Sequence, residues 1–257
     1  MNPFRRRERA ELPAANPAAT LWRVDQYAGQ SEVRVQATQL DTHEPSAARR
    51  RGIYAEWVEF LATTETSIVK LDLVSRVPQD LLDAVAGQRG LRKLVVKWGP
   101  YRDLSALSTL PRLEDLALLG ATGVASLEPL ASMPTLSQLT VSQAKEPSTS
   151  ALARMVHLRE LCVGNAYPGS DRSVVLPDLR WVVSLVELKH LDLPGTRILD
   201  PDLSPLLELP GLEGLRLPLR RSYRKQVFDF ASRSPVFAAV ASDYEEYDAF
   251  VASTSHG

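Results

Sequence analysis

The sequence predicts an α/β solenoid in which short repeats stack, with a parallel β-sheet on the concave face, short helices or 3₁₀ turns on the convex face, and a cap at each end. Two observations lead to this fold class. One six-residue pattern, apolar-x-x-Leu-x-apolar, occurs seven times at nearly constant spacing, and a second apolar pattern lies between its copies in the same phase. A fixed period of about 20 to 50 residues is the sequence signature of repeat architectures.

The first pattern predicts the strands. Its first copy is Ile68-Val69-Lys70-Leu71-Asp72-Leu73. Because side chains alternate across a strand, the apolar positions of each copy face one side and the residues between them face the other. The central leucines are Leu71, Leu94, Leu116, Leu139, Leu161, Leu191 and Leu215, at steps of 23, 22, 23, 22, 30 and 24 residues.

The second pattern predicts a short helical segment before each of several strands. Apolar residues at every third position are followed by Pro111 in one repeat, by Pro134 in the next and by Pro210 in the last. This spacing suits a short helix or 3₁₀ segment with one buried edge, which the proline then ends. No single repeat can bury its own apolar edge, so the repeats must stack.

These repeats resemble the leucine-rich-repeat family, specifically its short variety of about 22 residues found in internalins and in a regulatory subunit of protein phosphatase 1. The resemblance covers residues 67–217. The family often carries Asn three residues after each strand, where its side chain satisfies backbone groups along the stack. This sequence has other residues there, so its turns must satisfy those groups in another way. The positions hold Arg76, Gly99, Ala121, Ala144, Ala166 and Thr196.

Four segments are expected along the chain. Residues 1–19 are rich in Arg, Ala, Glu and Pro and are expected to be a disordered tail. Residues 20–66 are expected to form an N-terminal cap, and residues 67–217 hold the seven strands. Residues 218–257 are expected to form a helical C-terminal cap and tail. Caps are needed because a parallel solenoid exposes an apolar cross-section at each end.

The N-terminal cap is predicted to combine a hairpin with an amphipathic helix. Residues 21–24 and 32–37 are interpreted as two strands separated by Gly29. Ser46 is a candidate helix N-cap. The residues expected to form the apolar face of this helix are Ile53, Trp57, Phe60 and Leu61.

Residues between the leucines are expected to line the concave face, and stacked repeats use such extended faces for recognition. Interspersed charges favour a protein partner over nucleic acid, which needs a basic stripe. The alternative is a solvated face of mixed charge. The candidate partner-binding residues on this face are Lys70, Asp72, Lys93, Val95, Lys97, Asp115, Ala117, Gln138, Thr140, Glu160, Cys162, His190, Asp192 and Arg216.

Two loops are further candidates. The 30-residue step places an insertion at residues 165–177, and insertions in repeat proteins often lie on the binding face. Its Tyr167 and Arg172 are residue types that anchor interfaces, although a tolerated insertion without a role is an equal alternative. Trp98 and Tyr101, in the turn after the second strand, are open to the same two interpretations.

Composition and motifs argue against catalysis. The formal net charge is -1, so no overall field attracts nucleic acid or an anionic membrane. The chain lacks nucleotide-binding, metalloprotease and serine-hydrolase motifs, and no cofactor or metal site is expected. Cys162 and His190 are the one pairing that resembles a nucleophile and a base, and an exposed thiol on a binding sheet is the favoured interpretation. The basic run 220–225 is a candidate phosphate or nucleic-acid site, with a solvated helix face as the commoner meaning.

Together these observations predict a non-catalytic protein-binding module that is monomeric alone and binds neither membranes nor nucleic acid. The single cysteine favours a reducing, cytoplasmic location. A neutralising, immunity-type inhibitor of a toxin or enzyme is one alternative. A scaffold that assembles with itself is the other.

Overall fold

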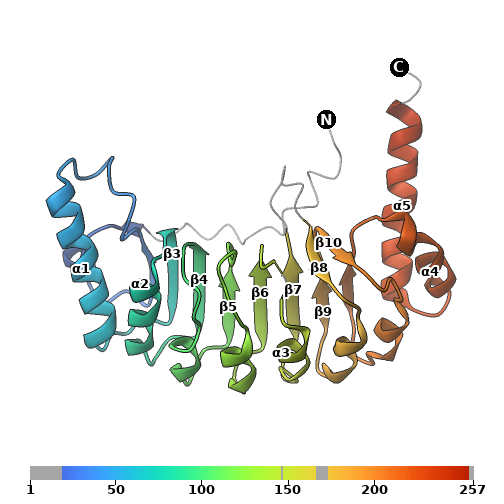
Figure 1. Cartoon of the computed structure of the whole chain (residues 1–257), viewed down its shortest axis with the longest axis horizontal. Coiled ribbons are helices and arrows are strands. Elements are labelled where there is room, and N and C mark those ends of the chain that lie inside the picture. The colour runs from blue at the N-terminus through green and yellow to red at the C-terminus, as the bar shows by residue number, and fades with distance from the viewer. Residues whose placement is uncertain (1–18, 146, 166–172, 255–257) are drawn as a thin grey trace.

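The computed structural model describes residues 19–145, 147–165 and 173–254, and nearly all of the predicted tail lies outside them. Its main sheet has nine strands in chain order, all parallel (Figure 1). The predicted solenoid is therefore confirmed. The strands are β1 (Thr20–Leu21), β2 (Glu32–Val35), β3 (Lys70–Arg76), β4 (Lys93–Trp98), β5 (Asp115–Leu118), β6 (Gln138–Ser142), β7 (Glu160–Gly164), β9 (His190–Asp192) and β11 (Gly214–Arg216).

The central leucines set the register of the sheet. Each lies opposite the central leucine of the next repeat, from Leu71 on β3 to Leu215 on β11. Six of the seven are buried, and only Leu215 in the last repeat is partly exposed. A shift of one residue would turn every leucine to solvent, so the repeat pattern fixes this register.

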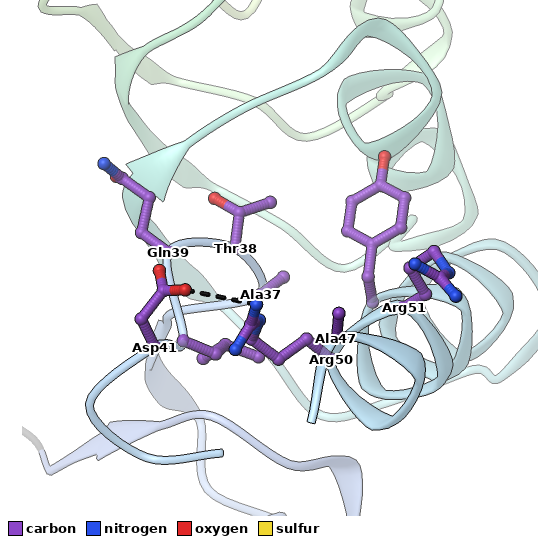
Figure 2. Close-up of a pocket in the computed structure, with 9 residues that line it drawn as sticks. Ala37, Thr38, Gln39, Asp41, Ala47, Arg50 and Arg51 are labelled. Carbon is purple, nitrogen blue, oxygen red and sulfur yellow. Dashed lines mark ion pairs between the residues drawn. The ribbon is translucent and has the colours of Figure 1, made fainter. Parts of the chain in front are cut away.

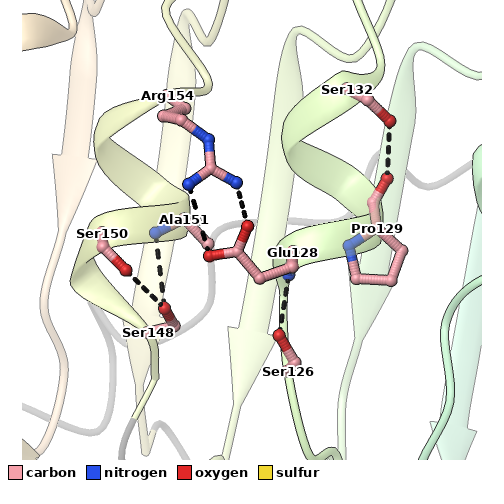
Figure 3. Close-up of polar contacts among 8 residues, drawn as sticks. All are labelled: Ser126, Glu128, Pro129, Ser132, Ser148, Ser150, Ala151 and Arg154. Atoms are coloured by element: carbon pink, nitrogen blue, oxygen red, sulfur yellow. Dashed lines mark hydrogen bonds and ion pairs between the residues drawn. The ribbon is translucent and has the colours of Figure 1, made fainter.

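Short helical segments connect the strands on the other side of the sheet (Figure 1). Their apolar residues complete the buried core, as the second sequence pattern predicts. Figure 3 shows one contact between successive segments, in which Arg154 and Glu128 form an ion pair. The segments are α2 (Gln79–Ala84), η3 (Val85–Gly87), η4 (Leu107–Thr109), η5 (Glu128–Ser132), α3 (Thr149–Ala153), η6 (Arg180–Ser184) and η7 (Ser204–Glu208).

The turns after the strands bond directly from one repeat to the next through the backbone. The Ala121 N–H donates to the Ser142 carbonyl at 2.8 Å, and the Gln143 N–H donates to the Gly164 carbonyl at 2.9 Å. Thr196, at another of the positions where the family often has Asn, donates its hydroxyl to the Leu193 carbonyl at 2.9 Å. These bonds satisfy buried backbone groups without an Asn ladder.

The N-terminal strands do not form the predicted hairpin. β1 and β2 are parallel, and β2 in turn pairs in parallel with β3. The expectation was wrong because β2 pairs with β3, and residues 22–31, which include η2 (Val24–Gln26), return the chain so that β2 runs in the same direction as β1. Val33 lies opposite Leu71, so β2 takes the place of a repeat strand.

The predicted helix of this end is present as α1 (Ala47–Thr63). Ser46 is its N-cap, and its hydroxyl accepts a hydrogen bond from the Arg49 N–H at 3.4 Å. Ile53, Trp57 and Leu61 are buried against the first repeats.

At the other end, α4 (Arg221–Ala231) packs against α5 (Pro235–Thr254), and α5 contacts β11. Tyr223, Phe237 and Tyr244 are buried there. The insertion contributes β8 (Val174–Leu176), which pairs in parallel with β10 (Thr196–Ile198) in a separate two-stranded sheet.

Candidate partner-binding face

The side chains between the leucines lie in two rows on the sheet face opposite the helical segments, here called the open face. All of them are at least partly exposed. The first row ends at β9, because Gly214 takes its position on β11. The first row is Glu32, Lys70, Lys93, Asp115, Gln138, Glu160 and His190. The second row is Arg34, Asp72, Val95, Ala117, Thr140, Cys162, Asp192 and Arg216.

The concave-face residues predicted from the sequence therefore lie together, with Lys97 just beyond the two rows. Glu32 and Arg34 were missed because β2 was assigned to a hairpin. The signal for them is the alternation in Glu32-Val33-Arg34-Val35, which matches the polar-apolar order of the repeat strands.

Charges on the open face pair sideways between neighbouring strands. Exposed pairs of this kind contribute about 0 to 1 kcal/mol each, so their main effect is to hold side chains in place and to leave little net charge. The ion pairs are Lys70 Nζ with Glu32 at 3.3 Å, Lys93 with Asp115, and Arg216 with Asp192 at 3.3 Å. The neutral Gln138 donates a hydrogen bond from Nε2 to Glu160 at 3.2 Å.

Two carboxyl groups on this face are partly buried. Burial raises the pKa of Asp72, although Lys70 and Arg34 oppose the shift. Its Oδ1 is buried and accepts no hydrogen bond within the described residues. Burial likewise raises the pKa of Asp192, opposed by Arg216.

The Cys162 and His190 pairing does not form a nucleophile and base. The two residues lie on adjacent strands, but Cys162 is opposite Asp192, and His190 is opposite Glu160. Burial, reinforced by the charge of Asp192, raises the pKa of the Cys162 thiol to about 12. The thiol is therefore protonated at neutral pH, and the thiolate is the reactive form of cysteine.

An apolar patch lies at the carboxyl ends of β3 to β5. Trp98 is 42% exposed and Leu119 is 44% exposed. Trp98 lies directly against Gly120 of the next repeat: a Cβ atom added to Gly120 would be only 2.6 Å from the Trp98 Cβ. Lys97 lies beside the patch and has no ion pair in the described part of the chain. The apolar patch consists of Val74, Val95, Trp98, Ala117 and Leu119.

Three further residues were predicted as possible partner contacts in loops: Tyr101, Tyr167 and Arg172. Tyr101 is fully buried, so it is part of the core and cannot contact a partner. Tyr167 and Arg172 lie outside the described residues. Their role remains a prediction.

The basic run is largely engaged within the C-terminal part of the structure. Arg220 donates to the Thr196 carbonyl at 2.8 Å, and Arg224 pairs with Asp248. Lys225 pairs with Asp229 at 2.6 Å. Three of the four cations of the run are thus engaged within the fold, two of them by a carboxylate.

No group of three or more potential metal ligands occurs among the residues with described positions. Across the same residues, no helix has the length and apolar character needed to cross a membrane.

One strand per repeat, central leucines in register and helical segments on the opposite side define this protein as a leucine-rich-repeat solenoid. No protein-family model and no curated protein matches the sequence. Among solved structures, it is similar to internalin C2 of Listeria monocytogenes str. 4b F2365, with 22% identity, coverage of 65% of this chain and 69% of that one, and a TM-score of 0.49.

Internalin F of the same strain is also similar, with 16% identity, coverage of 77% of this chain and 53% of that one, and a TM-score of 0.49. The plant peptide hormone receptor RGFR1, solved in complex with RGF2, is similar with 13% identity and a TM-score of 0.43. The match covers 72% of this chain and 27% of the receptor chain. The chain thus spans about half of internalin F. The class of protein is defined by the repeat geometry of this chain itself.

Proposed function

We propose that this protein is a non-catalytic binding module that recognises a protein partner through the open face. The observation that carries the proposal is the exposed Trp98 and Leu119 at one edge of a polar face that extends over eight strands. At about 4.8 Å between strands, that face spans on the order of 34 Å.

The apolar patch is the proposed anchor of the interface. Tryptophan is enriched among the residues that contribute most to binding, and such residues lie in the interior of an interface with polar groups around them. Trp98 and Leu119 lie at one edge of the open face, with Lys97 and the polar rows beside them.

The charge pattern favours protein over nucleic acid. Most charges on the open face pair with a neighbouring strand, so no basic stripe is left to track a phosphate backbone. Paired charges of both signs still select a partner, because a mismatched charge across an interface is costly. The single cysteine favours the cytoplasm as the proposed location.

The test is affinity capture from the native cell with a tagged wild type and two matched double variants. One variant, Trp98→Ala with Leu119→Ala, removes the anchor. The control, Val186→Ala with Leu199→Ala, removes two apolar side chains that are 61% and 58% exposed elsewhere. We expect a protein partner to be retained by the control and lost from the anchor variant, with both variants folded by circular dichroism.

Equal capture by the two variants would contradict the proposed anchor. A third variant reverses the charges of Lys93, Glu160 and Arg216, and undiminished capture by it would remove the open face from the interface. Recovery of the chain alone, with a mass that rises with concentration in light scattering, would instead support a self-assembling scaffold. If the captured partner is an enzyme, loss of its activity in the complex would identify a neutralising inhibitor.

A further inference from the structure

The C-terminal half of α5 carries a surface that the cap itself does not use. The Tyr244 hydroxyl donates to the Arg220 carbonyl at 2.7 Å. Beyond it, residues 245–254, here called the exposed end of α5, have exposed side chains except for the partly buried Phe250. Figure 1 shows that this end of the helix extends past the sheet. The buried residues of α5 are Val236, Phe237, Val240, Ala241 and Tyr244.

An apolar stripe continues from the buried part of α5 along its exposed end. Val240 and Tyr244 are buried, whereas Tyr247 is 44% exposed and Val251 is 40% exposed. The four residues follow one another at steps of four, three and four, and residues three or four apart lie on the same face of a helix. A helix of a soluble protein normally turns such a stripe toward a packing surface. The exposed end of α5 is therefore a docking surface.

The same half of α5 is strongly acidic. It carries Asp243, Glu245, Glu246 and Asp248, and residues 235–254 include no Lys or Arg. On α4, Arg224 pairs with Asp248. A second copy of the chain would present the same four carboxylates, so two α5 helices would repel each other. The charge favours an occupant that is basic and carries an apolar anchor.

Residues 4–9 of the N-terminal tail have this complementary chemistry. They combine one aromatic ring with four guanidinium groups, and Glu8 is the one acidic residue among them. The aromatic residue is Phe4, and the basic residues are Arg5, Arg6, Arg7 and Arg9.

Two other arginine-rich runs of the chain are held within the fold. In the run 49–51, Arg50 forms an ion pair with Asp41 at 3.3 Å (Figure 2). This run belongs to α1, at the opposite end of the stack from α5 (Figure 1). Three of the four cations in the run 220–225 are likewise engaged within the fold. Residues 4–9 are therefore the arginine-rich run best suited to α5.

The tail is long enough to reach α5 of the same chain. The described chain begins at residue 19, next to β1, and α5 contacts β11. At about 4.8 Å between strands, the path from β1 to β11 covers on the order of 38 Å. Residues 5–9 precede residue 19 by 10 to 14 positions. At about 3.3 Å per residue, an extended chain of that length spans roughly 33 to 46 Å.

We propose that residues 4–9 dock on the exposed end of α5, with the arginines against Glu245 and Glu246 and Phe4 on the stripe of Tyr247 and Val251. Guanidinium and carboxylate groups form strong paired hydrogen bonds. Aromatic rings add apolar contact area and favourable ring geometry. The contact joins the two ends of the solenoid within one chain, and it does not depend on the partner proposed for the open face.

The experiment measures trypsin cleavage after the tail arginines in the full chain, followed by mass spectrometry at fixed ionic strength. One variant, Glu245→Gln with Glu246→Gln, removes two of the carboxylates. A second, Tyr247→Ser with Val251→Ser, removes the apolar stripe. Neither variant creates or removes a trypsin site, and circular dichroism checks that both are folded.

The matched control is Glu56→Gln with Glu59→Gln, which removes two exposed carboxylates from α1. Light scattering on all four proteins measures whether the contact lies within one chain. A docked tail is cleaved only through its undocked fraction, so the cleavage rate reports the docking equilibrium.

We expect the wild type and the α1 control to be monomeric and to lose the tail at the same rate. Each α5 variant should lose it about threefold faster or more, since an exposed ion pair contributes up to about fivefold. Equal rates in all four proteins would overturn the proposal. A dimeric wild type that becomes monomeric in the α5 variants would also overturn it and would assign the contact to a second copy.

Discussion

The Ile198 N–H donates a buried 3.0 Å hydrogen bond to the phenolic oxygen of Tyr223. Ile198 ends β10, the outer strand of the small second sheet, and Tyr223 comes from α4. Arg220, next to α4, donates to the Thr196 carbonyl of the same strand at 2.8 Å. Two side chains thus satisfy backbone groups that a further strand would otherwise pair.

Replacing Tyr223 with Phe tests this contact. The variant keeps the buried ring but leaves the Ile198 N–H without an acceptor, and an unsatisfied buried donor costs about 1 to 3 kcal/mol. We expect the free energy of unfolding in urea to fall by that amount.

Tyr101→Phe is the matched control. The Tyr101 side chain is also fully buried, but its hydroxyl has no hydrogen-bond partner within the described residues. Removing that hydroxyl should leave the free energy of unfolding unchanged or raise it. Equal losses in the two variants would show that the Tyr223 hydrogen bond has no special role.

Gly99→Ala is predicted to destabilise the solenoid. A Cβ at this position would lie 1.9 Å from the Val77 carbonyl oxygen, so neighbouring turns would have to move apart. Overpacking of this kind costs about 1 to 3 kcal/mol. Gly52→Ala in α1 is the control, since its Cβ would contact nothing within 4 Å. It should instead stabilise the helix by about 0.5 to 1 kcal/mol, and thermal denaturation of both variants checks the difference in sign.

The pH dependence of Asp72→Asn follows from the raised pKa of Asp72, which results from burial. A carboxyl group with a higher pKa in the folded state favours folding at low pH, and this advantage is lost as pH rises through that pKa. We expect the Asn variant to be more stable than the wild type at neutral pH. The difference should shrink as the pH falls through the raised folded-state pKa towards about 4. Urea unfolding at neutral pH and near pH 4 measures the difference in the free energy of unfolding between the two proteins.

Asp202→Asn should behave in the opposite way. Hydrogen bonds from the Ser204 N–H and hydroxyl, both at 2.9 Å, lower the pKa of Asp202. A lowered pKa contributes stability at neutral pH that is lost as pH falls through the folded-state value. The Asn variant should therefore be slightly less stable at neutral pH and equal to the wild type in acid. The same sign for both variants would contradict these assignments.

Alkylation tests the environment of Cys162. Because its thiol pKa is raised to about 12, the thiolate fraction near pH 8 is far below that of an ordinary cysteine. We expect iodoacetamide to modify the folded protein on the order of 100-fold more slowly than the urea-denatured chain. Mass spectrometry over a time course gives both rates. A folded rate close to the denatured one would indicate a reactive thiol and reopen the question of catalysis.

Much of the fold follows from local sequence. The alternation around Leu71 and its six counterparts specifies which face each strand buries, and the constant step places those strands side by side. Both properties depend on residues close together in the chain. The two rows of the open face could therefore be predicted residue by residue, apart from Glu32 and Arg34.

The direction of β1 and β2 could not be derived in this way. Short alternating segments form hairpins or parallel pairs equally well, and the choice depends on packing against β3. The same limit applies to Trp98 and Tyr101, which are three residues apart. One is exposed and the other fully buried because of neighbours from other repeats.

The sequence by itself thus determined the repeat, the register of the leucines and the positions of the open face, because each depends on a periodic pattern within one stretch of chain. The tertiary structure alone decided which charges are paired and how Arg220 and Tyr223 complete β10. Those features depend on residues far apart in sequence, and only the stacked fold brings them within bonding distance.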